Sequence, residues 1–211
     1  MAECKDDYWG KFARTFDEDQ KYIVGEAIQR ALVGKLSAER DLGEVVEFGC
    51  GRGYYTGVLA NNSKSVIATD FSDEMLEMAR AQLKRFQNIT VQKADCESTT
   101  FPEEAFNTVV MINVIHVIEN PLNSLQESHR ILKAGGILLL ASYTGHTMKW
   151  FDRIKLVMRF LSKWGKPLSY FQGNLSPNQL NPLLQKAGFV IEESQLIGDK
   201  SKALYLKARK K

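Results

Sequence analysis

The fold of this chain is decided by residues 43–53, which read Gly-Glu-Val-Val-Glu-Phe-Gly-Cys-Gly-Arg-Gly. A short apolar run ends in Glu47, and glycines follow at positions 49, 51 and 53. Glycine adopts backbone angles that other residues avoid, and it has no Cβ to obstruct a ligand near the main chain. The stretch therefore predicts a buried parallel strand that turns sharply into a helix and leaves its backbone open to a ligand.

The next strand-like run, residues 65–70, ends in Asp70. An acid about 20 residues after a glycine-rich turn is where nucleotide-binding sheets hold a ribose. Ser72 follows and predicts a helix cap, because acidic residues fill the turn after it.

The remaining candidate elements alternate between strand and helix, which predicts a parallel sheet with crossover helices. Asp95 and Asn113 fall at the ends of two of the strands. The elements are strands over 89–96, 106–113 and 137–141, a helix over 121–132 and a turn over 133–136.

With these motifs in this order, the chain resembles the class I S-adenosylmethionine-dependent methyltransferases, in particular the type 11 small-molecule group. The resemblance extends over roughly residues 40–142, although Lys-Ala-Gly-Gly at 133–136 replaces the usual Lys-Pro-Gly-Gly. It implies S-adenosylmethionine as the cofactor. The implied cofactor-binding residues are Glu47, Phe48, Gly49, Cys50, Gly51, Gly53, Asp70, Phe71, Met75, Asp95, Cys96, Asn113 and Val114.

The resemblance also assigns a part of the cofactor to each group. The glycine amides and the helix start after Gly53 would meet the methionine carboxylate. Asp70 would accept hydrogen bonds from the ribose hydroxyls, and Asp95 would accept one from the adenine amine. Phe71 and Met75 would lie near the adenine, at the end opposite the methionine.

Several of these residues also have a purely structural interpretation. Asp70 could end a strand or cap the following helix, and Asp95 could be an exposed loop acid. Cys50 and Cys96 are better explained as small apolar side chains that line the cleft than as nucleophiles. A nicotinamide enzyme is disfavoured, because the dinucleotide fingerprint G-x-G-x-x-G requires glycine where this chain has Tyr54.

His116 is the candidate general base. It follows the fourth strand, where cofactor and acceptor should meet, and an unperturbed histidine pKa of about 6.5 suits proton removal near neutral pH. The alternative is a histidine that packs or hydrogen-bonds at the start of a helix. His129 is expected at the surface of a helix, and His146 has no predicted role.

The predicted fold class is α/β, a Rossmann-like seven-stranded, mostly parallel sheet with one antiparallel strand and helices on both faces. Residues 1–211 are expected to form a single domain with one core. Within it we expect an N-terminal helical cap (1–40), a cofactor-binding core (41–142), an inserted substrate lid after the fifth strand (143–174), and a C-terminal helix and hairpin (175–211). The helix expected in the cap is indicated by the spacing of Ile23, Ala27, Ile28, Ala31 and Leu32.

The inserted segment contains a candidate amphipathic helix over 148–164, with an apolar stripe and basic residues mostly opposite. The stripe is Phe151, Ile154, Val157, Met158, Leu161 and Trp164, and the basic residues are Lys149, Lys155, Arg159 and Lys163. Such a helix closes an acceptor pocket, packs on the sheet, or lies on an anionic membrane surface as a peripheral contact. Its position after the fifth strand favours the lid. Aromatic residues near the N-terminus are expected to fold over the cofactor or to pack on the sheet: Tyr8, Trp9, Phe12, Phe16 and Tyr22.

Composition limits the other function classes. The chain has 211 residues, a net charge of +3 and 25% charged residues, without a broad basic stripe, so a nucleic-acid partner is not expected. No signal peptide or membrane-spanning run is predicted. The three cysteines, Cys4, Cys50 and Cys96, lack metal-ligand spacing. We therefore expect no metal, no disulfide scaffold and a cytoplasmic location.

Together these features predict methyl transfer from S-adenosylmethionine to a small, partly apolar acceptor by in-line displacement. The protein would mainly position the acceptor and exclude water. The alternatives are an RNA or protein methyltransferase and a cofactor-binding partner subunit without activity of its own. An Asn-Pro-Pro-Tyr-type motif and an RNA-binding domain are missing, which disfavours the first. The sequence indicates no oligomeric state.

Overall fold

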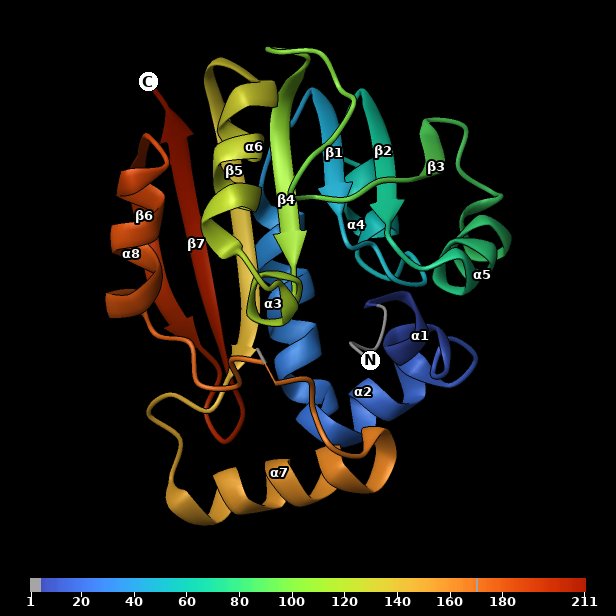
Figure 1. The fold of residues 1–211 in the computed structure, drawn as a ribbon, viewed down its shortest axis with the longest axis vertical. Helices are drawn as coiled ribbons and strands as arrows, with labels where there is room; N and C mark the ends of the chain where they lie inside the picture. The colour runs from blue at the N-terminus through green and yellow to red at the C-terminus, as the bar shows by residue number, and fades with distance from the viewer. Residues whose placement is uncertain (1–4, 170) are drawn as a thin grey trace.

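The computed structural model describes residues 5–169 and 171–211, so Cys4 lies outside the described residues (Figure 1). Within these ranges seven strands form one sheet in the order β3-β2-β1-β4-β5-β7-β6. The strands are β1 (Glu44–Phe48), β2 (Ser65–Asp70), β3 (Ile89–Lys93), β4 (Phe106–Ile112), β5 (Leu132–Thr144), β6 (Phe189–Ile197) and β7 (Lys202–Lys210).

The sheet is parallel except at one strand. Strands β1 to β5 pair in parallel, whereas β7 is antiparallel to both β5 and β6. The central strand β1 is buried on both sides, and its Val46 pairs with Ile67 of β2 and Val109 of β4. The apolar run before the glycines suits this place, because the strands of a parallel sheet are covered on both faces. The predicted fold class is confirmed.

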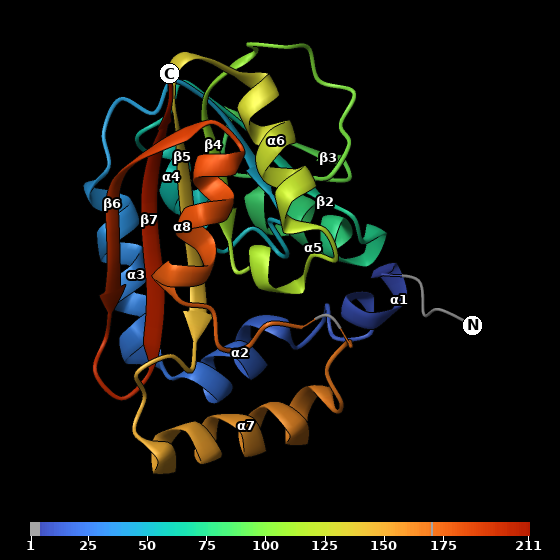
Figure 2. The same cartoon turned by 60° about the vertical axis from the view of Figure 1, so that its left-hand side comes forward.

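Helices cover both faces of the sheet (Figures 1 and 2). On one face, α3 (Glu26–Ala38) and α4 (Thr56–Ala60) pack in a cluster that contains Leu32 and Val45. On the other face, α6 (Pro121–Ile131) and α8 (Pro177–Lys186) pack in a cluster that contains Leu125 and Val46. Successive strand residues point to opposite faces, so Val45 and Val46 belong to different clusters. Each fully buried apolar side chain contributes about 1.5–3 kcal/mol.

The N-terminal segment differs from the prediction. The single helix expected through Ile23 and Leu32 is wrong, because the chain breaks at Gly25, which has φ +88°. Glycine adopts this angle without the clash that a Cβ would cause. Residues before the break form α1 (Lys5–Gly10) and α2 (Phe16–Val24), and α3 begins directly after it.

The turn predicted at 133–136 is part of a bulge at the start of β5. Leu132 pairs with Phe106 and Ile137 pairs with Thr108, so residues 133–136 leave the regular register. Gly135 carries the chain through this bend with φ +73°. The bulge lies at the end of the sheet opposite the glycine loop, and it does not affect the site described below.

Three helices lie beyond the carboxyl ends of the parallel strands: α1, α2 and α7 (Trp150–Trp164). Figures 1 and 2 show α7 as the outermost of them, packed on α2. Open parallel sheets bind ligands at this edge. None of the helices in the described ranges has both the length and the apolar character needed to cross a membrane.

Candidate cofactor and acceptor site

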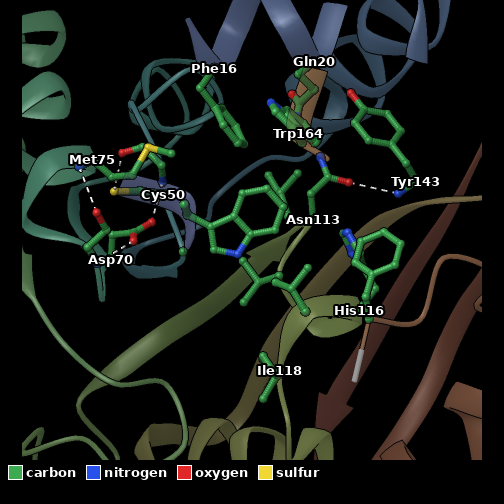
Figure 3. A pocket seen from close by; sticks show the side chains of 18 of the residues that line it. Phe16, Gln20, Cys50, Asp70, Met75, Asn113, His116, Ile118, Tyr143 and Trp164 are labelled. Atoms are coloured by element: carbon green, nitrogen blue, oxygen red, sulfur yellow. Dashed lines mark hydrogen bonds between the residues drawn. The ribbon is translucent and has the colours of Figure 1, made fainter. Parts of the chain in front are cut away.

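A cavity of about 320 Å³ lies at the carboxyl edge of the sheet. The segments after β1, β2 and β4 form one wall, and residues of α2 and α7 form the other. Figure 3 shows Asp70 and Met75 at one end, and Asn113, His116 and Tyr143 at the other. One cavity therefore joins residues predicted for the cofactor with the candidate general base.

The glycine loop after β1 contains three glycines with positive φ: Gly49, Gly51 and Gly53. A Cβ on Gly49, which has φ +67°, would lie 2.1 Å from Val114 Cγ2, so this position has no room for a side chain. Gly51 has φ +53°, and the nearest atom to an added Cβ is a ring carbon of Phe16 at 3.9 Å. Position 49 thus requires glycine because Val114 packs against it, and position 51 requires glycine because of its backbone conformation.

Asp70 connects this loop to the next helix, α5 (Asp73–Leu83). Its Oδ2 accepts a hydrogen bond from the Gly51 amide at 2.8 Å, and its Oδ1 accepts one from the Ser72 amide at 3.0 Å. Ser72 Oγ in turn accepts from the Met75 amide and caps α5. The cap is therefore Ser72, as predicted, and Asp70 is held with its carboxylate at the cavity wall.

Glu47 is almost fully buried beside the loop, with 1% of its surface exposed. Thr56 Oγ1 donates a hydrogen bond to Glu47 Oε2 at 2.5 Å. Burial raises the pKa of Glu47 to about 7; the Thr56 hydrogen bond opposes this shift and the charge of Asp70 adds to it. A carboxyl group that titrates near neutral pH in a cavity wall is typical of functional sites.

Asn113 lies at the other end of the cavity in a left-handed conformation, with φ +59°. Its Oδ1 accepts a hydrogen bond from the Tyr143 amide at 2.9 Å. Its Nδ2 is buried and has no hydrogen-bond partner in the described part of the chain, and the same holds for Trp164 Nε1. A buried donor costs about 1–3 kcal/mol unless a ligand or water satisfies it, so both groups are suited to contact a bound molecule.

His116 lies on a short 3₁₀ helix, η1 (Ile115–Val117), after β4. Its Nδ1 is 2.8 Å from Ser142 Oγ, and its ring packs edge-on against Phe171 with centroids 5.2 Å apart. Burial lowers the pKa of His116 to about 4, so the imidazole is neutral at pH 7. A neutral imidazole can accept a proton, but a pKa far below the working pH makes it a weak base.

Two tyrosines in the cavity were not predicted as site residues. The hydroxyls of Tyr55 and Tyr143 are 2.6 Å apart, and burial raises the pKa of both, which keeps them protonated near neutral pH. Two sequence signals were available: Tyr55 comes two residues after Gly53, and Tyr143 lies near the end of β5, at the edge where the other site residues gather.

The helical wall is aromatic. Trp164 stacks on Phe16 with centroids 5.2 Å apart, and Trp9 packs edge-on against Trp164 at 5.4 Å. These three rings line the cavity, so part of the N-terminal aromatic group does cover it. Tyr22 differs, since it is 52% exposed and lies under the cations of Arg159 and Lys163.

Helix α7 is oriented differently from the expectation. Its packed side chains are Leu156, Phe160 and Trp164, which line the cavity together with the partly exposed Val157 and Leu161. Of the interpretations left open for the predicted stripe, those that bury it against the protein hold for Trp164 but not for its other members, which are exposed to solvent. Two apolar stripes share this helix, and the one that packs is the one that meets the aromatic residues of α1 and α2.

Most residues predicted for the site do line the cavity: Glu47, Gly49, Cys50, Gly51, Asp70, Phe71, Met75, Asp95, Cys96, Asn113, Val114 and His116. The structure places the other two elsewhere. Phe48 is buried in the core, and Gly53 packs against Leu83. Asp95 Oδ1 accepts a hydrogen bond from the Glu97 amide at 2.9 Å. The residues that the structure describes contain no cluster suited to a metal ion.

The geometry fits the cofactor that the sequence predicts. The glycine loop contains three positive-φ glycines, a carboxylate is fixed at the end of β2, and a second acid, Asp95, lines the same cavity. These groups match the charged, hydroxyl and amine groups of a sulfur nucleoside.

Comparison with known proteins agrees. The family described as a methyltransferase domain matches residues 46–140. A demethylmenaquinone methyltransferase of Lactococcus lactis is 30% identical over 172 residues, which cover 73% of this chain and 68% of that protein. A demethylmenaquinone methyltransferase of Tropheryma whipplei is 33% identical over 101 residues, so the match covers 48% of this chain and 42% of that relative.

Among solved structures, an S-adenosylmethionine-dependent methyltransferase from Aquifex aeolicus superposes with a TM-score of 0.69 and 17% identity. The superposition covers 94% of this chain and 97% of that chain, which shows a common fold. With the sequence match to the Lactococcus protein, the chain belongs to the class I S-adenosylmethionine-dependent methyltransferases.

Proposed function

We propose that the protein transfers a methyl group from S-adenosylmethionine to a small, partly apolar acceptor of the quinol or phenol class. One observation carries the proposal. A single cavity has a polar wall of strand ends on one side and an apolar, aromatic wall of α2 and α7 on the other. The first wall suits a nucleoside, and the second suits an aromatic acceptor.

The polar wall would hold the cofactor. The amides of Cys50, Gly51 and Gly53 already donate hydrogen bonds within the protein, so the glycine loop would lie along the methionine part of the cofactor without binding its carboxylate through these three amides. Asp70 would hold the ribose and Asp95 the adenine amine, with Phe71 and Met75 beside the adenine ring. The cofactor supplies an electrophilic methyl group when bound. The protein therefore has to fix the acceptor in line and exclude water, for which a cavity covered by α7 is suited.

The apolar wall would hold the acceptor. Its rings offer surface for an aromatic acceptor, and Asn113 Nδ2 and Trp164 Nε1 are buried donors that require an acceptor atom. A ring that carries oxygens satisfies both requirements. The names of the two bacterial relatives, demethylmenaquinone methyltransferases, agree with a quinol-type acceptor.

His116 would take up the acceptor proton. When Nδ1–H donates to Ser142 Oγ, and Ser142 donates to the Tyr143 carbonyl at 3.3 Å, Nε2 carries the lone pair. Because the pKa of His116 is low, this arrangement favours an acceptor that is itself acidic, such as a phenol or quinol.

Methyl transfer from labelled S-adenosylmethionine to a panel of short-chain quinols and catechols tests the proposal. We expect labelled product from at least one quinol with the wild-type protein and none with Gly51→Val. Cofactor binding without transfer to any member of the panel would contradict the acceptor class and favour a partner subunit without activity. Transfer to RNA or protein alone would favour the other alternative.

A further inference from the structure

Helix α7 carries an exposed apolar face. Of nine large hydrophobic side chains exposed in the described part of the chain, six lie on this one helix. They are Trp150, Phe151, Ile154, Val157, Met158 and Leu161, of which Met158 is 66% exposed and Trp150 62%. Their spacing puts them on one side of the helix. A surface helix normally turns such a stripe toward the core, and large exposed apolar patches mark interaction sites.

Basic residues border this apolar face. Residues 149–166 contain six lysines and arginines against one aspartate, a net charge of +5, which exceeds the +3 of the entire chain. By helical periodicity, Lys155 lies on one side of the face and Arg153 on the other. A second cavity of about 210 Å³ lies beside the helix, and its lining includes Lys155, Arg159 and Lys200 together with Asp152.

The charge decides between two occupants of this face. In a symmetric dimer the same patch meets itself, so the segments 149–166 of two copies, each with a net charge of +5, would face each other. Of these cations, Lys163 pairs with Asp19 of α2. An anionic lipid surface would neutralise the cations and take up the apolar side chains. The helix has 15 residues, or about 22 Å at 1.5 Å per residue, which is enough to lie in the interface and too short to span a bilayer.

The cavity reaches this face as well. Val157 and Leu161 belong to the apolar face, line the cavity and are each 48% exposed, so they lie at the cavity rim. Figure 2 shows α7 as the outermost element on that side of the molecule, with no other element drawn beyond it. An apolar molecule dissolved in lipid could therefore enter the cavity without crossing water.

We propose that α7 is an interfacial helix that docks the protein on an anionic lipid surface, with the cavity rim facing the lipid. The proposal does not depend on methyl transfer, because it rests on the outer face of α7 and on its charges. It gives the proposed acceptor, which is partly apolar, a route into the site.

Vesicle flotation of the full-length protein tests this proposal without cofactor or acceptor. We expect binding to vesicles that contain roughly one phosphatidylglycerol in four lipids, much weaker binding to pure phosphatidylcholine, and weaker binding at high salt. Met158→Glu should lower the partition coefficient at least about tenfold, because the lost burial of one large apolar side chain is of that size. Val190→Glu is the matched control, since Val190 is an exposed apolar residue of β6 and the charge change is the same.

A second pair of variants tests the charges. Lys155→Gln and Lys200→Gln should each lower binding to the anionic vesicles roughly fivefold, the effect of about 1 kcal/mol for each cation near the surface. Equal binding of Met158→Glu and Val190→Glu would overturn the proposal. So would a dimer in sedimentation that Met158→Glu dissociates while the wild-type protein ignores vesicles, because the face would then belong to a second copy. Circular dichroism confirms that each variant is folded.

Discussion

The two walls of the cavity are held in place by different forces. On the strand side, polar side chains are fixed by hydrogen bonds: Asp70 accepts from two backbone amides, and Glu47 accepts from Thr56. On the helical side, Trp164 is held mainly by contacts with aromatic rings, and its indole nitrogen has no hydrogen-bond partner among the described residues. Hydrogen bonds fix the direction in which a side chain points, whereas contacts between aromatic rings allow the rings to slide past each other. The polar wall of strand ends, called the strand wall below, is therefore suited to one constant ligand. The apolar wall of α2 and α7, called the helical wall below, is suited to an acceptor whose shape can vary.

The largest expected effect comes from a substitution in the strand wall. Gly51→Val should abolish measurable binding of S-adenosylhomocysteine, because a branched side chain would occupy the space beside the loop amides. The protein should remain folded, since an added Cβ meets nothing closer than 3.9 Å and the left-handed conformation costs only about 1–2 kcal/mol. Calorimetry measures the binding.

Gly135→Val is the matched control for this change. Gly135 also has a positive φ, +73°, and has no atom within 4 Å of an added Cβ, but it lies at the opposite end of the sheet. The control should be strained to the same degree and bind the ligand normally. Equal loss of affinity in both variants would show that strain, and not the ligand's approach, explains the result.

The strand wall was also the part that the sequence predicted well. Its strands are continuous apolar runs, and the glycines and acids follow them directly, so position along the chain translates into position at one edge of the sheet. Asp70 and Asn113 could be assigned because each immediately follows, or ends, such a run.

The helical wall could not be predicted to the same extent. Helix α7 has one apolar stripe through Phe151 and Met158 and a second through Leu156 and Phe160, and periodicity alone does not decide which one packs. The position of α2 determines which stripe packs, and that position depends on the break at Gly25. Contacts between distant segments, which no local pattern encodes, therefore set this wall.

The second prediction concerns a substitution in the helical wall. Trp164→Ala should lower the free energy of unfolding by about 3–5 kcal/mol, because it removes a large buried ring from the cluster of α1, α2 and α7. Urea denaturation measures this loss. Trp164→Leu keeps more of the volume and should lose less.

The loss of the Trp164 ring should leave the strand wall intact. In Trp164→Leu, S-adenosylhomocysteine should bind within a few-fold of the wild-type affinity. A much larger loss of affinity would show that the two walls are not independent.

The third prediction concerns two buried groups whose titrations oppose each other. The folded pKa of Glu47 is about 7, above its ordinary value of 4.5, so the native state holds an extra proton and stability from this group falls as pH rises from 4.5 to 7. The folded pKa of His116 is about 4, below 6.5, so stability from this group falls as pH drops from 6.5 to 4. Each effect amounts to about 3 kcal/mol over its range.

Single variants should separate the two effects. Relative to the wild-type protein, Glu47→Gln should become more stable as pH rises from 5 to 7, and His116→Gln should become more stable as pH falls from 6.5 to 4.5. Denaturation at a series of pH values gives both differences. A difference that does not change with pH in either variant would mean that the group is not buried as the structure shows.

The smallest expected effect concerns one carboxylate. Asp70→Ala should weaken binding of S-adenosylhomocysteine by about 1.5–3 kcal/mol, the scale of hydrogen bonds to a charged group. Asp73→Ala is the matched control, because this acid is exposed, pairs with Lys93 and does not line the cavity. If both variants bind alike, Asp70 does not hold the ribose.

The central claim is that the strand wall is a site for S-adenosylmethionine, and titration calorimetry on the purified protein tests it most directly. S-adenosylmethionine and S-adenosylhomocysteine should each bind at one site per chain, and NAD should give no heat at the same concentrations. The claim would be contradicted by binding of NAD with no heat from either sulfur nucleoside.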